Sequence, residues 1–90
     1  MGAICIHCKV LGRVQGVFYR RAIYERAKAL SLTGWVKNMP DESVEALICG
    51  DEKAVGEMQA FLWVGSLASE VQEVKVNKVP FKMHTEFKIK

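Results

Sequence analysis

Apolar and polar residues alternate at the beginning of the chain. An apolar residue stands at every second position of the segment 4–11, at Ile4, Ile6, Cys8 and Val10. Residues two positions apart lie on the same face of an extended strand. The pattern therefore predicts a strand over residues 4–11 with one buried face.

From Tyr19 onward the apolar residues recur at intervals of three and four. The first set with this spacing is Tyr19, Ala22, Ile23, Ala27 and Leu30. This spacing is typical of an amphipathic helix and predicts one from about residue 18 to about residue 31. A second such set follows Asp51, a residue suited to cap a helix; its members are Ala54, Val55, Met58, Phe61 and Leu62.

Two predicted strands, 33–38 and 43–50, lie between these helices. The segment that joins them contains Pro40 and Asp41. Proline presets the backbone angle of a turn, and aspartate favours turn positions. We therefore expect the two strands to form a hairpin.

Two further strands are indicated near the end of the chain, one by Val74 with Val76 and a possible short fifth one by Phe87 with Ile89. The order β-α-β-β-α-β predicts an α+β fold of the ferredoxin-like type, with an antiparallel sheet in the order 4-1-3-2 and two helices on one face. Half of the 90 residues are hydrophobic, which suffices for one core. We predict a single domain, 1–90.

Side-chain chemistry predicts how the strands pair. The first and third strands are antiparallel neighbours in this topology, so paired residues have a constant index sum. A sum of 54 pairs Ile6 with Ile48 on the apolar face and Lys9 with Glu45 on the other. A sum of 82 between the second and third strands directs Asn38 to the helix side and leaves Trp35 on the open face.

The same register places Cys5 directly opposite Cys49. Thiols of cytoplasmic proteins are mostly reduced, so two free cysteines and a disulfide both stay open at this point. Cys8 lies three residues after Cys5 and therefore on the opposite face of the strand. We accordingly predict no metal site in the segment 5–8.

A turn with two glycines joins the first strand to the first helix. Gly12 and Gly16 allow a tight backbone turn, and the following helix directs unpaired amides at it. These amides, together with the guanidinium of Arg20, are suited to hold a phosphate group. The predicted binding residues, called the phosphate loop below, are Gln15, Gly16, Val17, Phe18, Tyr19 and Arg20.

Two segments of the chain resemble the signature motifs of the acylphosphatase family. They are LGRVQGVFYR at 11–20 and GWVKN at 34–38, the latter followed by Asp41 and by VE at 44–45. The resemblance implies hydrolysis of the carboxyl-phosphate bond of small acyl phosphates, with Arg20 binding the phosphate and Asn38 placing the attacking water. Glu42 stands where the family commonly has glycine. In a left-handed backbone it would cost about 1 to 2 kcal/mol.

The available side chains fit this chemistry without a metal or another cofactor. An acyl phosphate releases a carboxylate, whose conjugate acid has a pKa of about 4, so the leaving group needs no proton at neutral pH. Positioning and charge stabilisation are then the main tasks of the protein. A phosphate-binding module without turnover is the alternative.

Charge and composition limit the possible partners. The net charge of +3 weakly favours anionic ligands, and no apolar segment approaches the roughly 18 residues needed to span a bilayer. The predicted open faces of the first and third strands have no aromatic residues on which RNA bases could stack. We expect a cytoplasmic monomer that binds neither nucleic acid nor membrane.

Overall fold

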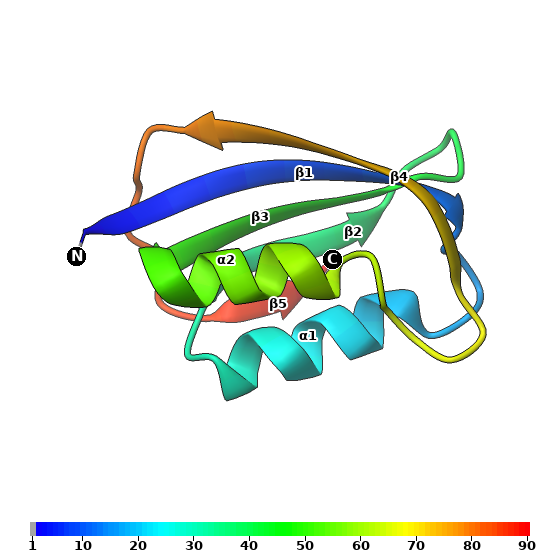
Figure 1. Cartoon of the computed structure of the whole chain (residues 1–90), viewed down its shortest axis with the longest axis horizontal. Helices are drawn as coiled ribbons and strands as arrows, with labels where there is room; N and C mark the ends of the chain where they lie inside the picture. Colours follow the sequence, from blue (N-terminus) through cyan, green and yellow to red (C-terminus); the bar gives the residue numbers. More distant parts are fainter. Residues whose placement is uncertain (1) are drawn as a thin grey trace.

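A computed structural model describes residues 2–90 and contains one five-stranded sheet with two helices (Figure 1). The elements are β1 (Ala3–Arg13), α1 (Tyr19–Ala29), β2 (Thr33–Asn38), β3 (Val44–Asp51), α2 (Glu52–Phe61), β4 (Glu70–Val79) and β5 (Phe87–Ile89). The strand order is β4-β1-β3-β2-β5, and both helices cover the same face (Figure 1). The predicted ferredoxin-like α+β fold is confirmed. The short fifth strand extends the sheet beside β2, to which it is parallel.

Both predicted strand registers are confirmed. β1 and β3 pair Ile6 with Ile48 and Lys9 with Glu45, and β2 pairs with β3 at the expected index sum of 82. Trp35 lies on the open face, where Lys37 Nζ is 4.9 Å from the centre of its ring. Because the strand register fixes which face each side chain occupies, it also places Asn38 on the helix side of the sheet.

The core lies between the two helices and the sheet. α1 buries Tyr19, Ile23 and Ala27, and α2 buries Val55 and Met58. The sheet contributes a set of buried residues from four strands: Ile6, Cys8, Val10, Val36, Val44, Ala46, Ile48 and Phe87. Burying a large apolar side chain contributes roughly 1.5 to 3 kcal/mol. The ends of β1, α1 and β2 are therefore attached to a well-packed framework.

In the structure Cys5 and Cys49 are joined by a disulfide, with an S–S distance of 2.03 Å. They belong to β1 and β3 and face each other in the register. Both are fully buried, and the Sγ of Cys5 contacts the main-chain oxygen of Lys82 at 3.7 Å. Cys8 is the free cysteine of the described residues, and burial raises the pKa of its thiol to about 12.

Backbone conformation explains where the elements differ from the predicted ranges. α1 is shorter than expected because Phe18 (φ 65°) and Ser31 (φ 57°), which flank it, are left-handed and cannot continue a right-handed helix. β1 continues to Arg13 through an irregularity at Gly12, where a Cβ atom would lie 2.2 Å from the main-chain oxygen of Glu70.

In the turn between β2 and β3, Glu42 has the left-handed backbone whose cost was considered above. Glu42 has φ 72°, so its side chain costs about 1 to 2 kcal/mol there. The turn is held by main-chain bonds from Met39 N to Ser43 O (2.8 Å) and from Glu42 N to Met39 O (3.1 Å). These bonds fix the backbone immediately after Asn38.

Candidate active site

The connection from β1 to α1 forms a left-handed loop that ends at an uncapped helix. Gly16 (φ 74°) and Phe18 (φ 65°) are both left-handed, an arrangement that turns successive amides toward one concave side. Phe18 is the N-cap of α1, but no side chain among the described residues caps this terminus, and the first turn contains no acidic residue. The amides of the first turn and the positive end of the helix dipole are thus free for an anion.

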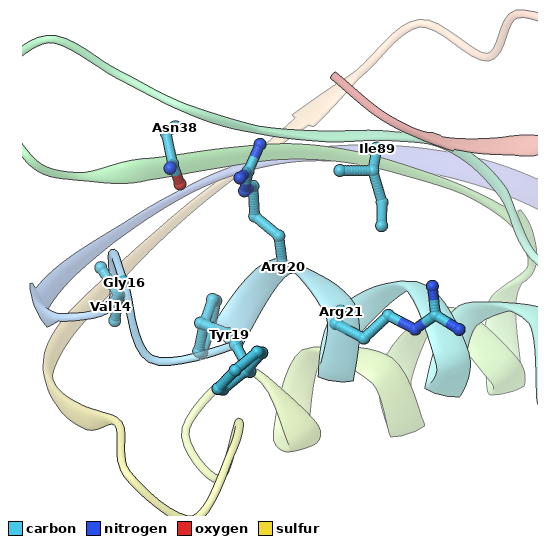
Figure 2. A pocket seen from close by; sticks show the side chains of 8 residues that line it. Val14, Gly16, Tyr19, Arg20, Arg21, Asn38 and Ile89 are labelled. Carbon is cyan, nitrogen blue, oxygen red and sulfur yellow. The ribbon is translucent and has the colours of Figure 1, made fainter.

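Arg20 extends from the first turn of α1 toward the sheet. Figure 2 shows its guanidinium between the side chains of Asn38 and Ile89. Its Nη1 donates a hydrogen bond of 2.8 Å to the main-chain oxygen of Lys90. This bond uses one of five guanidinium N–H groups, so the remaining donors of Arg20 can bind a ligand while its position is held.

Asn38 approaches the same space from the end of β2. Figure 2 shows its amide directed toward the gap above the loop. Its Oδ1 is buried and has no hydrogen-bond partner within residues 2–90. An unpaired buried oxygen costs about 1 to 3 kcal/mol, which indicates that this atom is arranged to accept a hydrogen bond from a bound molecule.

Gln15 connects the loop to the turn that follows Asn38. Its Nε2 donates to the main-chain oxygens of Met39 and Ser43, both at 2.8 Å. The two loops lie at the same end of the sheet (Figure 1). Gln15 therefore fixes the distance between the helix terminus and Asn38, and its side-chain amide is directed at the turn.

Tyr19 anchors the start of α1 to the segment that follows α2. It is fully buried, and its hydroxyl donates a 2.7 Å hydrogen bond to the main-chain oxygen of Leu62, just after α2. Burial raises the pKa of this hydroxyl, so the group stays protonated and acts as a structural donor. Gly65 lies so close to the ring that a Cβ atom would be 2.5 Å from it.

Asp41 stabilises the turn beside the site. Its carboxylate accepts hydrogen bonds from the amide and the hydroxyl of Ser43 and pairs with Lys9 Nζ at 2.9 Å. The bonds from Ser43, followed by Lys9, hold the pKa of Asp41 well below its usual range. The turn is therefore braced by an ionised aspartate at neutral pH.

The loop, the helix terminus and β2 enclose a pocket of about 300 Å³ (Figure 2). Its volume is at the lower end of the range for small-molecule sites. The lining residues are Val14, Gly16, Phe18, Tyr19, Arg20, Arg21, Asn38 and Ile89. A tetrahedral anion and a small attached group fit a pocket of this size and charge.

Comparison with known proteins decides the family. The family model described as acylphosphatase matches residues 6–89. The chain belongs to the acylphosphatase family. It is 41% identical over 86 residues to the acylphosphatase of Methanothrix thermoacetophila, an alignment that covers 96% of each protein. The predicted family and enzyme class are thereby confirmed.

Solved acylphosphatase structures share the fold along nearly the whole chain. The structure from Coxiella burnetii has a TM-score of 0.94 at 34% identity and covers 98% of this chain and 93% of its own. The structure from Bacillus subtilis has a TM-score of 0.93 at 34% identity, with coverage of 96% and 97%. The arrangement of strands and helices described above is thus that of the acylphosphatase family.

The structure brings most of the predicted site residues of this acylphosphatase-family chain together, but not all of them. Arg20, Asn38, Gly16, Phe18 and Tyr19 line one pocket. Gln15 supports the loop from behind, and the side chain of Val17 belongs to the core. Their roles toward a ligand remain predictions.

Three pocket residues were not predicted as part of the site: Val14, Arg21 and Ile89. The guanidinium of Arg21 pairs with Glu25 at 2.9 Å. Ile89 could have been found only from the pairing of β5 with β2, because alternation with Phe87 places it on the helix side.

Two further findings concern metal ions and membranes. Within residues 2–90, no group of three His, Cys, Asp or Glu side chains is arranged to hold a metal ion. None of the helices in the described part of this acylphosphatase-family chain is long and apolar enough to cross a membrane.

Proposed function

We propose that this chain hydrolyses small acyl phosphates to a carboxylate and inorganic phosphate without a metal ion. The observation that carries the proposal is the meeting of Arg20 and Asn38 in one pocket at the uncapped start of α1 (Figure 2). Membership of the acylphosphatase family supports the same reaction.

The phosphoryl group binds at the helix terminus in this proposal. Main-chain amides between Gln15 and Arg20, together with the free guanidinium donors of Arg20, hold its oxygens. The bond to Lys90 keeps the Arg20 side chain in place before the substrate arrives. Donors that are already oriented stabilise charge in the transition state without further reorganisation.

Asn38 positions the water molecule that attacks phosphorus. Its unpaired, buried Oδ1 accepts a hydrogen bond from this water and directs an oxygen lone pair at the phosphorus. The new P–O bond forms as the P–O bond to the acyl group breaks, and the bonding electrons leave with the carboxylate. One proton of the attacking water passes to a phosphate oxygen of the substrate and the other stays on the attacking oxygen, so no general base of the protein is required.

The test measures phosphate release from acetyl phosphate in the presence of a metal chelator. Removal of one oriented hydrogen-bonding side chain from an active site lowers kcat by about 10² to 10³ where that side chain is an oxyanion donor, and we take the same order of magnitude for the amide of Asn38. We expect a loss of this size in kcat for Asn38→Ala with little change in KM, and loss of both binding and turnover for Arg20→Ala. Arg13→Ala and Asn77→Ala are matched controls, because both residues are exposed and lie outside the pocket.

The outcomes separate an enzyme from a binding module. An Asn38→Ala variant that changes KM alone would contradict the role of Asn38 with water. Phosphate binding by the wild type without phosphate release, measured by calorimetry, would identify the chain as a binding module. Loss of activity with chelator alone would contradict the metal-independent mechanism.

A further inference from the structure

Two apolar side chains at the mouth of the pocket have no evident role in phosphate binding. Phe18 is 81% exposed and Ile89 is 40% exposed, and both line the pocket. Phe18 also holds a left-handed backbone, which glycine or asparagine would adopt at lower cost. A large side chain that is kept in such a position, with little packing of its own, is suited to contact a ligand.

The direction of the reaction places the acyl group on the side of Ile89. In phosphoryl transfer the attacking and leaving oxygens lie roughly in line, on opposite sides of phosphorus. Asn38 and Ile89 flank Arg20 on opposite sides (Figure 2). If water attacks from the side of Asn38, the acyl group leaves on the side of phosphorus opposite Asn38, and Ile89 lines the pocket on that side of Arg20.

Strand geometry agrees with this direction. Ile89 pairs with Val36, two residues before Asn38 on β2. Two residues along a strand and one step between strands separate Asn38 from Ile89 by about 8 Å. Asn38 and Ile89 therefore lie at opposite ends of the pocket, with the Arg20 guanidinium between them.

Two positively charged side chains close to Ile89 in sequence or in the pocket, Arg21 and Lys90, interact with other residues of the protein. Arg21 forms an ion pair with Glu25. The Nζ of Lys90 lies 5.3 Å from the centre of the Trp35 ring, which is on the open face of the sheet. Apart from Arg20, the charge in the pocket lining is therefore that of Arg21, which is paired with Glu25.

We propose that Phe18 and Ile89 form an acyl-binding rim that selects acyl phosphates with an uncharged apolar or aromatic acyl group. This inference rests on the proposed function, since it takes the phosphoryl group to be bound at Arg20. The rim buries part of the acyl group and excludes water from one side of it, and this favourable contact is smaller for an acetyl group, which has less apolar surface.

The experiment compares kcat/KM for benzoyl phosphate and acetyl phosphate. The intrinsic reactivity of each substrate is the same for every variant, so a change in the ratio of the two values reports on the protein. Apolar contacts of this kind discriminate by about tenfold at the lower end of their range. We expect Phe18→Asn and Ile89→Thr each to lower the ratio by about tenfold, and Phe18→Leu to retain most of it.

The variants are chosen to preserve the fold. Asparagine tolerates the left-handed backbone at position 18, and threonine is β-branched and suits the strand at position 89. Phe81→Asn is the matched control, because Phe81 is 47% exposed and outside the pocket. The control should leave the ratio unchanged.

Failure of the rim and failure of the proposed function give different results. An unchanged ratio in both rim variants, or equal losses on both substrates, would overturn the rim. If the wild type released no phosphate from either substrate, the proposed function would be wrong. In that case the affinities of phenacylphosphonate and acetonylphosphonate, in which a methylene replaces the bridging oxygen, decide the rim by the same comparison.

Discussion

Reduction of the disulfide between Cys5 and Cys49 should remove a large part of the stability of the chain. The bond joins residues 44 positions apart. For a loop of this length, the chain-entropy relation gives a loss of about 13 cal/mol/K in the unfolded state, or about 4 kcal/mol at 25 °C. Measured values commonly fall at about 2 to 4 kcal/mol. A chain of 90 residues has a total stability of only about 5 to 13 kcal/mol.

The fold itself should survive reduction. Cys5 and Cys49 face each other within a ladder of eight paired positions between β1 and β3, and the other pairs do not depend on the sulfur atoms. Both side chains are buried, so reduction leaves two thiols in the same space. We therefore expect a less stable protein with an unchanged far-ultraviolet circular dichroism spectrum.

Urea unfolding at neutral pH, with and without reductant, measures the effect. Mass spectrometry after thiol blocking shows whether the bond was present. Cys8→Ala keeps the disulfide and removes the remaining free cysteine of the described residues, so it controls for thiol exchange. Equal free energies of unfolding for the oxidised and reduced proteins, with the change in mass established, would refute the entropic reasoning.

Two further changes test the supports of the site. Gln15→Ala leaves the main-chain oxygens of Met39 and Ser43 without their donor. We expect it to lower the free energy of unfolding, measured in a urea titration, by about 1 to 3 kcal/mol. A loss below about 0.5 kcal/mol, which is the smallest net contribution of one hydrogen bond, would contradict this role. The folded state lowers the pKa of Asp41 through Ser43 and then Lys9, so its stabilising contribution is present above the unfolded pKa of about 3.9 and is lost as the pH falls below it. Asp41→Asn should therefore lower stability at neutral pH and flatten its decrease in acid, and a variant with the wild-type acid slope would show that Asp41 does not cause that slope.

The sequence predicts the sheet of this protein well because its strands alternate cleanly. Lys9 with Glu45 and Ile6 with Ile48 fix one register, and a shift by one residue would bury Lys9. The same logic places Asn38 on the helix side and Trp35 on the open face, and the structure agrees on both. The convergence of Arg20 and Asn38 on one pocket follows from this topology.

The rest depends on contacts that local patterns do not encode. The bond from Arg20 to Lys90 spans 70 positions and requires the parallel pairing of β5 with β2, which three residues are too few to indicate. The left-handed backbone of Phe18 is contrary to the preference of its residue type. For that reason the predicted helix began one residue too early. Neither the exposure of the Phe18 side chain nor the place of Ile89 in the pocket lining was foreseen.

The contact between Arg20 and Lys90 also bears on the order in which the protein matures. Synthesis proceeds from the N-terminus, so the segments that form β1, α1 and β3 are made before residues 87–90. At that stage the guanidinium lacks its main-chain acceptor and the pocket lacks one wall. The side chain of Arg20 is therefore held in place only after residues 87–90 have joined the sheet.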